Sequence, residues 1–523
     1  MAISVVTTIH DPAEGDPKPH PTPWADIPWG PGHLLYHAES RLAALFLPGE
    51  NGFSSTVEAS DALSTTAALQ EDTPVYSLPR LDTAECRACT TASRTSATLV
   101  PTTDCNLRCV YCYSRGGEIQ LVMSWDIAQA AIDLLLVNAL RLRHVLKGQA
   151  VDVTLNFTGG GEPTLPWALF SRSVAYFVGT ARSHGLQPHV HVTTNCVFPS
   201  DRLNSFATYR EVLRFGLSLD GPPTIQDAQR PGVARPAGHI ALANAREIDR
   251  LGFDFGVHAT ITAASAPCLA QIVTYFAEAL PHCKALSLVP VMHSGRAIDK
   301  RLEPVTLTRF LPAFLELYKD WGRRIRLSTP GWTMEPHGAH CGAHLFQNFV
   351  VSPQGLLSRC QEVTRGDERD ASAYVYGRYD PATRTFRIDR EAVASQLHAL
   401  YDDYYCAQCF ARTHCAGGCL RALYASGIGP SFVQTPACHA AQTITKCLIA
   451  YAVYDLPALP PSTRTPLPQF DLMHAFSDLQ GSPLVRPDYF LCRTWEPRQT
   501  LLKLVRVPLG YPHRSRLDTS AAE

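Results

Sequence analysis

The sequence has no run of 18 or more apolar residues, the length that a helix needs to span a bilayer. Its first residues, MAISVVTTIHDPAEG, lack the basic region and apolar run that mark a secretory signal. Neither sign of charge dominates, because 46 Lys and Arg residues oppose 47 Asp and Glu residues. A basic footprint for nucleic acid or for an anionic membrane is therefore missing. We expect a cytoplasmic globular protein with no membrane partner and no nucleic-acid partner.

Cysteine, in contrast, is abundant, with 17 among 523 residues. Because the cytosol keeps thiols reduced, this number favours metal ligation or redox chemistry over a disulfide framework. Three of the cysteines, Cys105, Cys109 and Cys112, form a CxxxCxxC pattern in PTTDCNLRCVYCYSRG. Three thiolates in one loop can hold three corners of a 4Fe-4S cube and leave the fourth iron for another ligand. An ordinary metal site or a disulfide cluster is the alternative on these cysteines alone.

The surrounding sequence predicts an α/β fold. From residue 95 to about residue 330, strand-like and helix-like segments alternate, which is typical of a parallel sheet with crossover helices. Ser124 is expected to cap a helix that stops at Gly148. Six strands make a partial (β/α)6 TIM-like barrel, in which the chemistry lies at the carboxyl ends of the strands. We expect these strands at 95–101, 151–157, 189–194, 212–219, 253–261 and 285–291.

Segments with candidate ligand-binding residues follow the second and third strands. The second strand runs into TGGGEP, where Gly160 and Gly161 precede Glu162. Glycines allow a ligand to approach the backbone closely, although a glycine-rich turn is also common after a strand. The third strand runs into Asn195, which is a candidate for the same pocket or a simple turn residue.

The fourth strand runs into SLDGPPTIQDAQRP, which contains Ser218, Asp220 and Arg230. An arginine at this place can grip a carboxylate with a bidentate fork. A serine can serve a ribose or carboxylate oxygen, whereas Asp220 could equally be a structural cap.

A second group of cysteines follows the predicted barrel. CAQCFARTHCAGGC has the pattern CxxCx5CxxxC, with single cysteines before and after it. Zinc ribbons favour two CxxC knuckles, so this spacing indicates a different kind of site. The candidate ligands are Cys341, Cys360, Cys406, Cys409, Cys415, Cys419 and Cys438.

Together, these motifs resemble the radical S-adenosylmethionine (radical SAM) enzymes with a SPASM domain, over residues of about 95–445. The resemblance implies that Cys105, Cys109 and Cys112 hold the radical-generating cluster. The open iron would then be chelated by the amino and carboxylate groups of S-adenosylmethionine. The implied cofactor pocket consists of Tyr111, Gly160, Gly161, Glu162, Asn195, Ser218 and Arg230.

The resemblance also implies two auxiliary 4Fe-4S clusters, which makes three clusters in total. Cys406, Cys409, Cys415 and Cys438 would hold one auxiliary cluster, and Cys341, Cys360 and Cys419 the other. Seven ligands for two cubes leave one iron short. Cys447 or His344 is a conceivable eighth ligand, but we favour a position that is open to substrate or solvent.

The activity that the resemblance implies is hydrogen abstraction by a 5′-deoxyadenosyl radical from a peptide or protein side chain. A low-potential reductant such as flavodoxin or ferredoxin would supply the electron. We expect a maturase of a ribosomally synthesised precursor peptide, which forms a crosslink or oxidises a side chain. The alternatives are an anaerobic sulfatase-maturating enzyme and a maturase of a quinone-cofactor protein. A non-catalytic iron-sulfur electron carrier is disfavoured, because it gives no reason for the GGGEP and SLDG pocket.

One residue weighs against the sulfatase-maturating alternative. In that family an Asp directly follows the cysteine of the GxxxxC element and acts as the base. Here Gln361 follows Cys360, and Glu362 comes one residue later.

The domain organisation that we expect has four regions. Residues 1–94 are irregular or recognise a peptide, and 34–49 within them form a hairpin or a strand and helix. Cys86 and Cys89 in that region are expected to be incidental thiols. The barrel, the SPASM domain and a proline-rich extension follow at 95–330, 335–450 and 451–523.

Overall fold

The computed structural model describes most of the central part of the chain and short pieces outside it. Backbone strands are described within residues 25–53 and at 503–506. The described residues in between are 94–145, 148, 150–292, 294–322, 324–329, 341, 348–368, 371–398, 409, 411, 415, 418, 419, 421 and 438–446.

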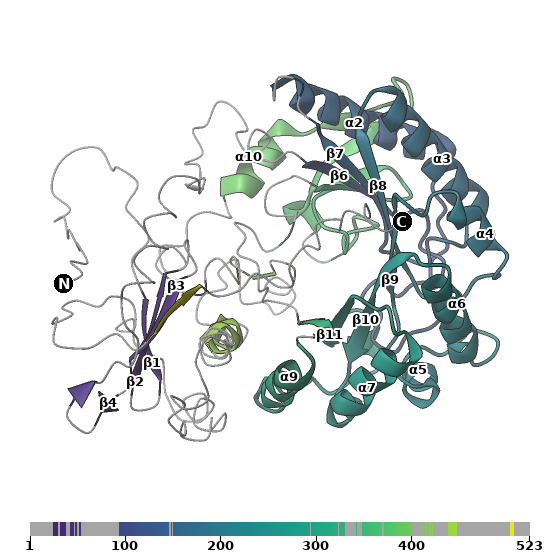
Figure 1. The fold of residues 1–523 in the computed structure, drawn as a ribbon. Helices are drawn as coiled ribbons and strands as arrows, with labels where there is room; N and C mark the ends of the chain where they lie inside the picture. The colour runs from purple at the N-terminus through teal and green to yellow at the C-terminus, as the bar shows by residue number, and fades with distance from the viewer. Residues whose placement is uncertain are drawn as a thin grey trace, which may run out of the picture.

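A parallel sheet forms the centre of the molecule, and its strands lie in space in the order in which they occur in the chain (Figure 1). The six expected strands are confirmed within a few residues. A further parallel strand, β12 (Arg326–Ser328), extends the edge beside the sixth. The six are β6 (Arg94–Leu99), β7 (Asp152–Phe157), β8 (Gln187–Thr194), β9 (Leu213–Leu217), β10 (Asp254–Ile261) and β11 (Ala285–Pro290).

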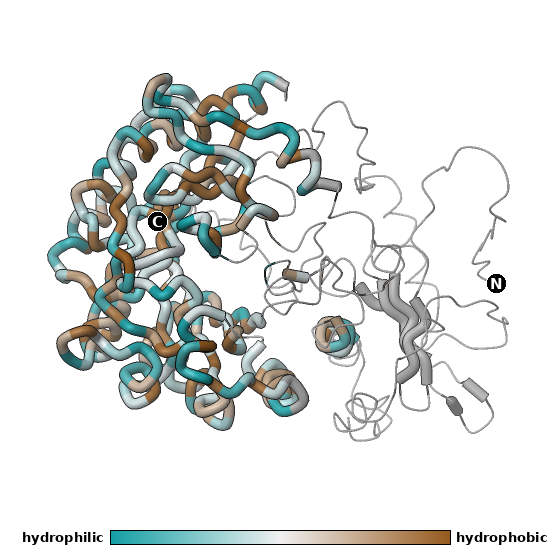
Figure 2. Tube along the Cα trace, turned by 180° about the vertical axis from the view of Figure 1, so that it is seen from behind, coloured by the Kyte–Doolittle hydropathy of each residue, from teal (hydrophilic) through white to brown (hydrophobic). Residues whose placement is uncertain are grey.

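Helices cover the outer side of this sheet in an arc (Figure 1). Because neighbouring strands follow one another in the chain, right-handed crossovers place every connecting helix on the same face. The tube in Figure 2 alternates between hydrophilic and hydrophobic along this layer, as helices with one packed face require. The helices of this layer are α2 (Trp125–Val145), α3 (Trp167–Ser183), α4 (Arg202–Ala207), α5 (Pro223–Gln229), α6 (Gly238–Arg250), α7 (Leu269–Ala279) and α9 (Leu307–Trp321). The short helix α8 (Arg296–Asp299) follows β11 and contacts the segment of Cys109 and Cys112 instead.

Helix α2 begins and ends as its sequence predicts. The Ile127 backbone N–H donates to Ser124 Oγ over 3.3 Å, which satisfies one of the free N–H groups of the first turn. At the other end Gly148 has φ of +84° and its N–H donates to the Arg143 carbonyl over 2.9 Å. This left-handed glycine closes the helix.

The sheet continues on its other side into the cysteine-rich part of the chain. Strand β13 (Asn348–Val351) runs parallel to β6, with Val350 opposite Thr98. It is followed by the antiparallel strands β14 (Leu356–Ser358), β15 (Val375–Asp380) and β16 (Thr385–Ile388), and then by α10 (Arg390–His398). Among the described residues this gives one sheet of 11 strands.

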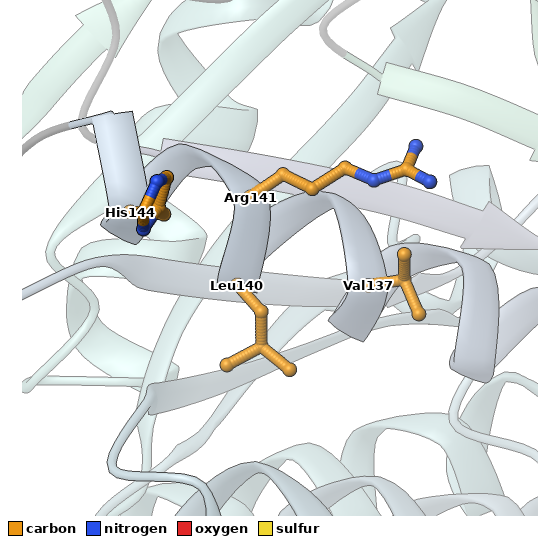
Figure 3. A pocket seen from close by; sticks show the side chains of 4 residues that line it. All are labelled: Val137, Leu140, Arg141 and His144. Atoms are coloured by element: carbon orange, nitrogen blue, oxygen red, sulfur yellow. The ribbon is translucent and has the colours of Figure 1, made fainter.

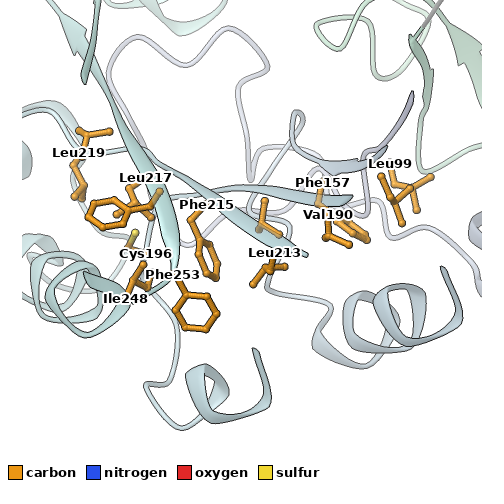
Figure 4. Packing of buried hydrophobic residues seen from close by; sticks show 14 of the residues in the cluster. Leu99, Phe157, Val190, Cys196, Leu213, Phe215, Leu217, Leu219, Ile248 and Phe253 are labelled. Carbon is orange, nitrogen blue, oxygen red and sulfur yellow. The ribbon is translucent and has the colours of Figure 1, made fainter. Parts of the chain in front are cut away.

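The hydrophobic core lies between the sheet and the helices (Figure 4). In β7, Val153, Leu155 and Phe157 are buried on the helical side, and the residues between them are less buried on the concave side. A row of edge-to-face aromatic contacts crosses this core, with ring centroids 4.7–5.5 Å apart. Such pairs add about 0.5–1.5 kcal/mol each beyond their buried area. The row consists of Phe157, Phe170, Phe206, Phe215 and Phe253.

A small antiparallel sheet combines both ends of the chain. Strands β1 (Ala25–Trp29), β2 (Gly32–His37) and β3 (Leu42–Phe46) pair in order, and β17 (Lys503–Arg506) pairs with β3. A further two-stranded pair joins β4 (Pro48–Gly49) and β5 (Gly52–Phe53). The expected hairpin within 34–49 is therefore present. Within the described residues, no helix combines the length and apolar character needed to span a membrane.

Candidate cofactor and iron-sulfur site

The loop with the three clustered cysteines follows β6 and is held by the segments after β9 and β11. Its Arg108 and Val110 N–H groups donate to the carbonyls of Pro231 and Gln229 over 2.8 and 2.9 Å. From the other side, the Arg296 guanidinium donates to the Cys109 carbonyl over 2.9 Å. The loop is thus fixed at the carboxyl ends of the strands, as predicted.

The thiols of this loop lie in a partly buried and protein-lined environment. Burial, and then the neighbouring Cys109 thiol, raises the pKa of Cys105 to about 12. Burial likewise raises the pKa of Cys109 to about 11, although Arg230 opposes the shift. Metal binding at these thiols must therefore displace protons.

Donor groups surround the sulfur atoms. Cys105 Sγ lies 3.5 Å from the Leu107 N–H and 3.8 Å from Asn195 Nδ2, and Cys112 Sγ lies 3.3 Å from the Gly116 N–H. Such donors stabilise cluster thiolates. Among the described residues, no three His, Cys, Asp or Glu side chains converge on a single-ion site.

The glycine segment after β7 packs directly on the cysteine loop. Gly160 has φ of +63°, and its carbonyl accepts a hydrogen bond of 2.5 Å from Ser114 Oγ. A Cβ atom at Gly161 would overlap the Asp104 carbonyl. These glycines therefore let two backbone segments approach closely.

Glu162 is a buried brace. Its Oε1 accepts hydrogen bonds from the hydroxyls of Thr164 (2.7 Å) and Thr194 (2.8 Å), and its Oε2 accepts one from the Asn195 N–H (2.8 Å). Burial raises its pKa, and these hydrogen bonds lower it. The carboxylate ties the ends of β7 and β8 together and positions Asn195 beside Cys105.

Asp220 is the centre of a second buried network and has no solvent exposure. Its Oδ2 accepts hydrogen bonds from Tyr111 Oη (2.5 Å) and Gln229 Nε2 (2.8 Å). Its Oδ1 accepts one from the Thr260 N–H (2.9 Å) and lies 3.0 Å from Arg230 Nε.

The guanidinium of Arg230 also lies over the Tyr111 ring, with 5.4 Å from its carbon to the ring centroid. Burial lowers the pKa of Arg230, but Asp220 and Tyr111 outweigh this and raise it above its ordinary value. Burial is the main cause that raises the pKa of Tyr111. A permanent positive charge thus lies beside the cysteine loop.

Sequence reasoning missed Gln229 and Thr260 as parts of this network. Gln229 donates to Asp220 and to the Thr260 carbonyl, and its Oε1 accepts from Thr262 Oγ1 over 2.7 Å. The available signal was the buried polar pair of Gln226 and Gln229 on α5. Ser218 lies nearby and is half-buried.

Six of the cysteines after the barrel lie in the described part of the chain. Burial raises the pKa of Cys360, and the charges of Glu362, Cys419 and Cys341 raise it further. Gln442 Nε2 lies 3.6 Å from Cys409 Sγ and 3.9 Å from Cys438 Sγ. Cys360 and Cys438 both pack against the small core that contains Cys415. Cys406, His344 and Cys447 lie outside the described residues, as do Cys86 and Cys89.

The two cysteine regions meet at Tyr113. Burial raises its pKa, and the charges of Glu362, Cys112 and Cys360 act on it in the same direction. Glu362 itself lies 3.7 Å from Arg421 Nε.

A surface depression of about 500 Å³ lies on α2, lined by Val137, Leu140, Arg141 and His144 (Figure 3). It is an open hollow in the helical layer, and the sequence gives it no chemical motif.

No protein-family model matches the sequence. The structure matches that of native anSMEcpe with bound AdoMet over 68% of this chain and 96% of that chain, with a TM-score of 0.50 and 16% identity. The chain has the fold of anSMEcpe. The expected partial radical SAM barrel with a cysteine-rich region after it is thereby confirmed as a fold.

Native anSMEcpe with bound AdoMet and Kp18Cys peptide matches with a TM-score of 0.50 and 16% identity, over 68% of this chain and 98% of that one. The uncharacterized protein MJ0907 of Methanocaldococcus jannaschii is 27% identical over 175 residues, or 33% of this chain. The chain spans about half (55%) of the length of that relative.

Proposed function

We propose that the chain is a radical SAM enzyme that modifies a peptide. The observation that carries this proposal is the loop of Cys105, Cys109 and Cys112, held at the carboxyl ends of the strands between the Glu162 brace and the Asp220–Arg230 pair. The fold shared with a protein solved with bound AdoMet and peptide supports the same conclusion.

In the proposed enzyme, different residues hold the cluster and bind the cofactor. The three thiols hold the cluster, and Asn195 donates toward Cys105. Arg230, fixed by Asp220, offers a buried positive charge to an anionic group of the cofactor. Bound at a reduced cluster, S-adenosylmethionine supplies one-electron, hydrogen-abstracting chemistry.

The other cysteines belong to two auxiliary clusters in this proposal, which accept the electron that an oxidised substrate loses. The grouping of Cys360 with Cys341 and Cys419 supports the first, and the Gln442 contacts to Cys409 and Cys438 support the second. The proposed regions are the barrel at 95–330, a SPASM domain at 335–450, and the flanking segments 1–94 and 451–523. The electron donor is a reductant such as flavodoxin or ferredoxin.

The substrate that we propose is a ribosomally synthesised precursor peptide rather than a sulfatase. Gln361 stands where a sulfatase-maturating enzyme would carry its Asp base. The neighbouring Glu362 is close to Arg421, which lowers the pKa that burial raises. This acid is therefore held by the protein beside Tyr113.

Anaerobic reconstitution tests the proposal. With dithionite, the reconstituted chain should cleave S-adenosylmethionine to 5′-deoxyadenosine and methionine and contain about twelve irons, as three cubes require. Cys105→Ala should abolish the cleavage. Cys268→Ala, at a cysteine outside the proposed cluster ligands, should preserve it. Absence of cleavage by the wild-type chain with intact clusters would refute the enzymatic proposal.

A further inference from the structure

A second surface hollow of about 500 Å³ lies between the loop that leads from β8 to α4 and the first turns of α6 (Figure 1). Its lining is mainly apolar and includes Val197, Pro199 and Ala243, to which Ser200 and His239 add polar groups. Pro199, Ser200, His239 and Ala243 are exposed to solvent, so the hollow is open to a partner. No motif in the sequence explains this surface.

The floor of the hollow is held rigidly. Its backbone contains Cys196, which is buried and has φ of +62°, a conformation that is uncommon for a residue other than glycine. The buried Asn244 of α6 donates to the carbonyls of Cys196 and Phe198, over 2.8 Å each. On the other side, the Val197 N–H donates to Asn195 Oδ1 over 2.8 Å. A partner would therefore meet a preformed surface, which reduces the entropy that binding costs.

Hydrogen bonds connect this floor with the cysteine loop. The Val197 carbonyl accepts a hydrogen bond of 2.6 Å from Asn106 Nδ2, and Asn106 directly follows Cys105 in the chain. Asn106 Oδ1 in turn accepts one of 2.8 Å from Asn195 Nδ2, which also lies 3.8 Å from Cys105 Sγ. A short path of covalent and hydrogen bonds thus leads from the hollow to a thiol of the proposed cluster.

The hollow on α2 lacks this connection. It has a similar volume of about 500 Å³ and also combines apolar side chains with a basic one, Arg141. Within the part of the chain that the structure describes, none of its lining residues forms a hydrogen bond with the cysteine loop. The link to Cys105 therefore distinguishes the hollow beside α6.

The charges around the hollow favour an acidic partner. Segments 197–202 and 231–246, which form it, carry three arginines and a single acidic residue, Asp201. Two of these arginines, Arg235 and Arg246, are exposed to solvent. Complementary charge of this kind steers a partner toward a surface and orients it there.

We propose that this hollow is the docking site of an acidic one-electron carrier protein that reduces the cluster of Cys105, Cys109 and Cys112. This inference rests on the proposed function, which requires an electron but leaves its point of entry open. In the step, the reduced carrier loses one electron and the cluster gains it, and no atom is transferred. Weak electron-transfer complexes bury little surface, which suits an open hollow of this size.

The test compares two electron sources for S-adenosylmethionine cleavage by the anaerobically reconstituted full chain. Dithionite is a small reductant that needs no docking surface, whereas flavodoxin or ferredoxin, kept reduced by NADPH and a reductase, must dock. Ala243→Glu adds a negative charge at an exposed helix position that suits glutamate. It should raise the KM for the carrier about tenfold at low salt and less at high salt, and leave cleavage with dithionite unchanged. Val137→Glu, in the hollow on α2, should change neither.

Four results would overturn the inference or the function beneath it. A wild-type KM for the carrier in Ala243→Glu would overturn the inference, and if that variant fails to fold, a wild-type KM in Arg235→Glu would do so. Slower peptide modification by Ala243→Glu with dithionite would show that the hollow binds the peptide instead. Failure of both carriers to drive a wild-type chain that dithionite drives would also overturn it. Absence of cleavage by the wild type with dithionite would instead refute the proposed function.

Discussion

Asp220→Asn should destabilise the protein strongly, although the two side chains have nearly the same shape. Asp220 is completely buried, and four groups converge on its carboxylate: a phenol, an amide, a backbone N–H and the Arg230 guanidinium. The substitution leaves Arg230 as an uncompensated buried charge. Breaking a buried pair in this way costs about 3–5 kcal/mol.

A matched control lies in the same segment. Asp227 Oδ1 accepts hydrogen bonds from the Ala237 and Gly238 N–H groups over 3.1 and 2.8 Å. The amide oxygen of Asp227→Asn can still accept both, so this variant should lose only about 1 kcal/mol or less.

The assay is anaerobic urea denaturation followed by circular dichroism, with midpoints compared at unchanged slope. Asp220→Asn should also lose iron, since the 229–231 segment that carries the cysteine loop depends on the same network. Equal losses in Asp220→Asn and Asp227→Asn would show that the ion pair is not a main support of this region.

Gly161→Ala should lower the iron content and the stability, because the new Cβ atom would overlap a backbone carbonyl of the cysteine loop. The control Gly179→Ala, whose Cβ atom would meet no atom within 4 Å, should be neutral or slightly stabilising. Iron analysis and thermal unfolding of both variants test this difference. Glu162→Gln should cost about 1–3 kcal/mol, because the new amide group must replace at least one acceptor that the Asn195 N–H or the two threonine hydroxyls now use; wild-type stability in urea would contradict the brace. In cluster-free protein, Cys105 and Cys109 should react slowly with iodoacetamide at pH 8, because their raised pKa values keep the thiolate fraction small. Their reaction rates should rise about tenfold per pH unit toward pH 11. Rates measured by mass spectrometry that equal those of a free peptide thiol at pH 8 would refute this.

Local sequence patterns predicted the helix ends and the strands, which depend on residues close together in the sequence. The cap at Ser124, the stop at Gly148 and the strands of the barrel follow from capping, glycine conformation and periodicity, and the structure confirms them. The position of the cysteine loop also followed, because carboxyl ends of parallel strands share one edge.

The roles of single polar side chains depended on partners that are distant in the sequence. The cofactor role of Glu162 stays a prediction, and the structure adds protein partners for its carboxylate that lie up to 33 positions away. Asp220 was left between two roles, and its partner Tyr111 lies 109 positions earlier. The pairing of β13 with β6 joins segments about 250 positions apart, and no periodicity in either one indicates it.

The pairing of β13 with β6 fixes the distance between the two cysteine regions. Because β6 leads to the cysteine loop and β13 leads through β14 to Cys360, backbone hydrogen bonds rather than a linker determine the spacing of the two cysteine regions. A slip of one residue between β13 and β6 would shift one region by about 3.3 Å and turn its side chains to the other face. Hinge motion between the regions is thereby suppressed, and in the proposed enzyme the path for an electron between them would have a length set by strand register.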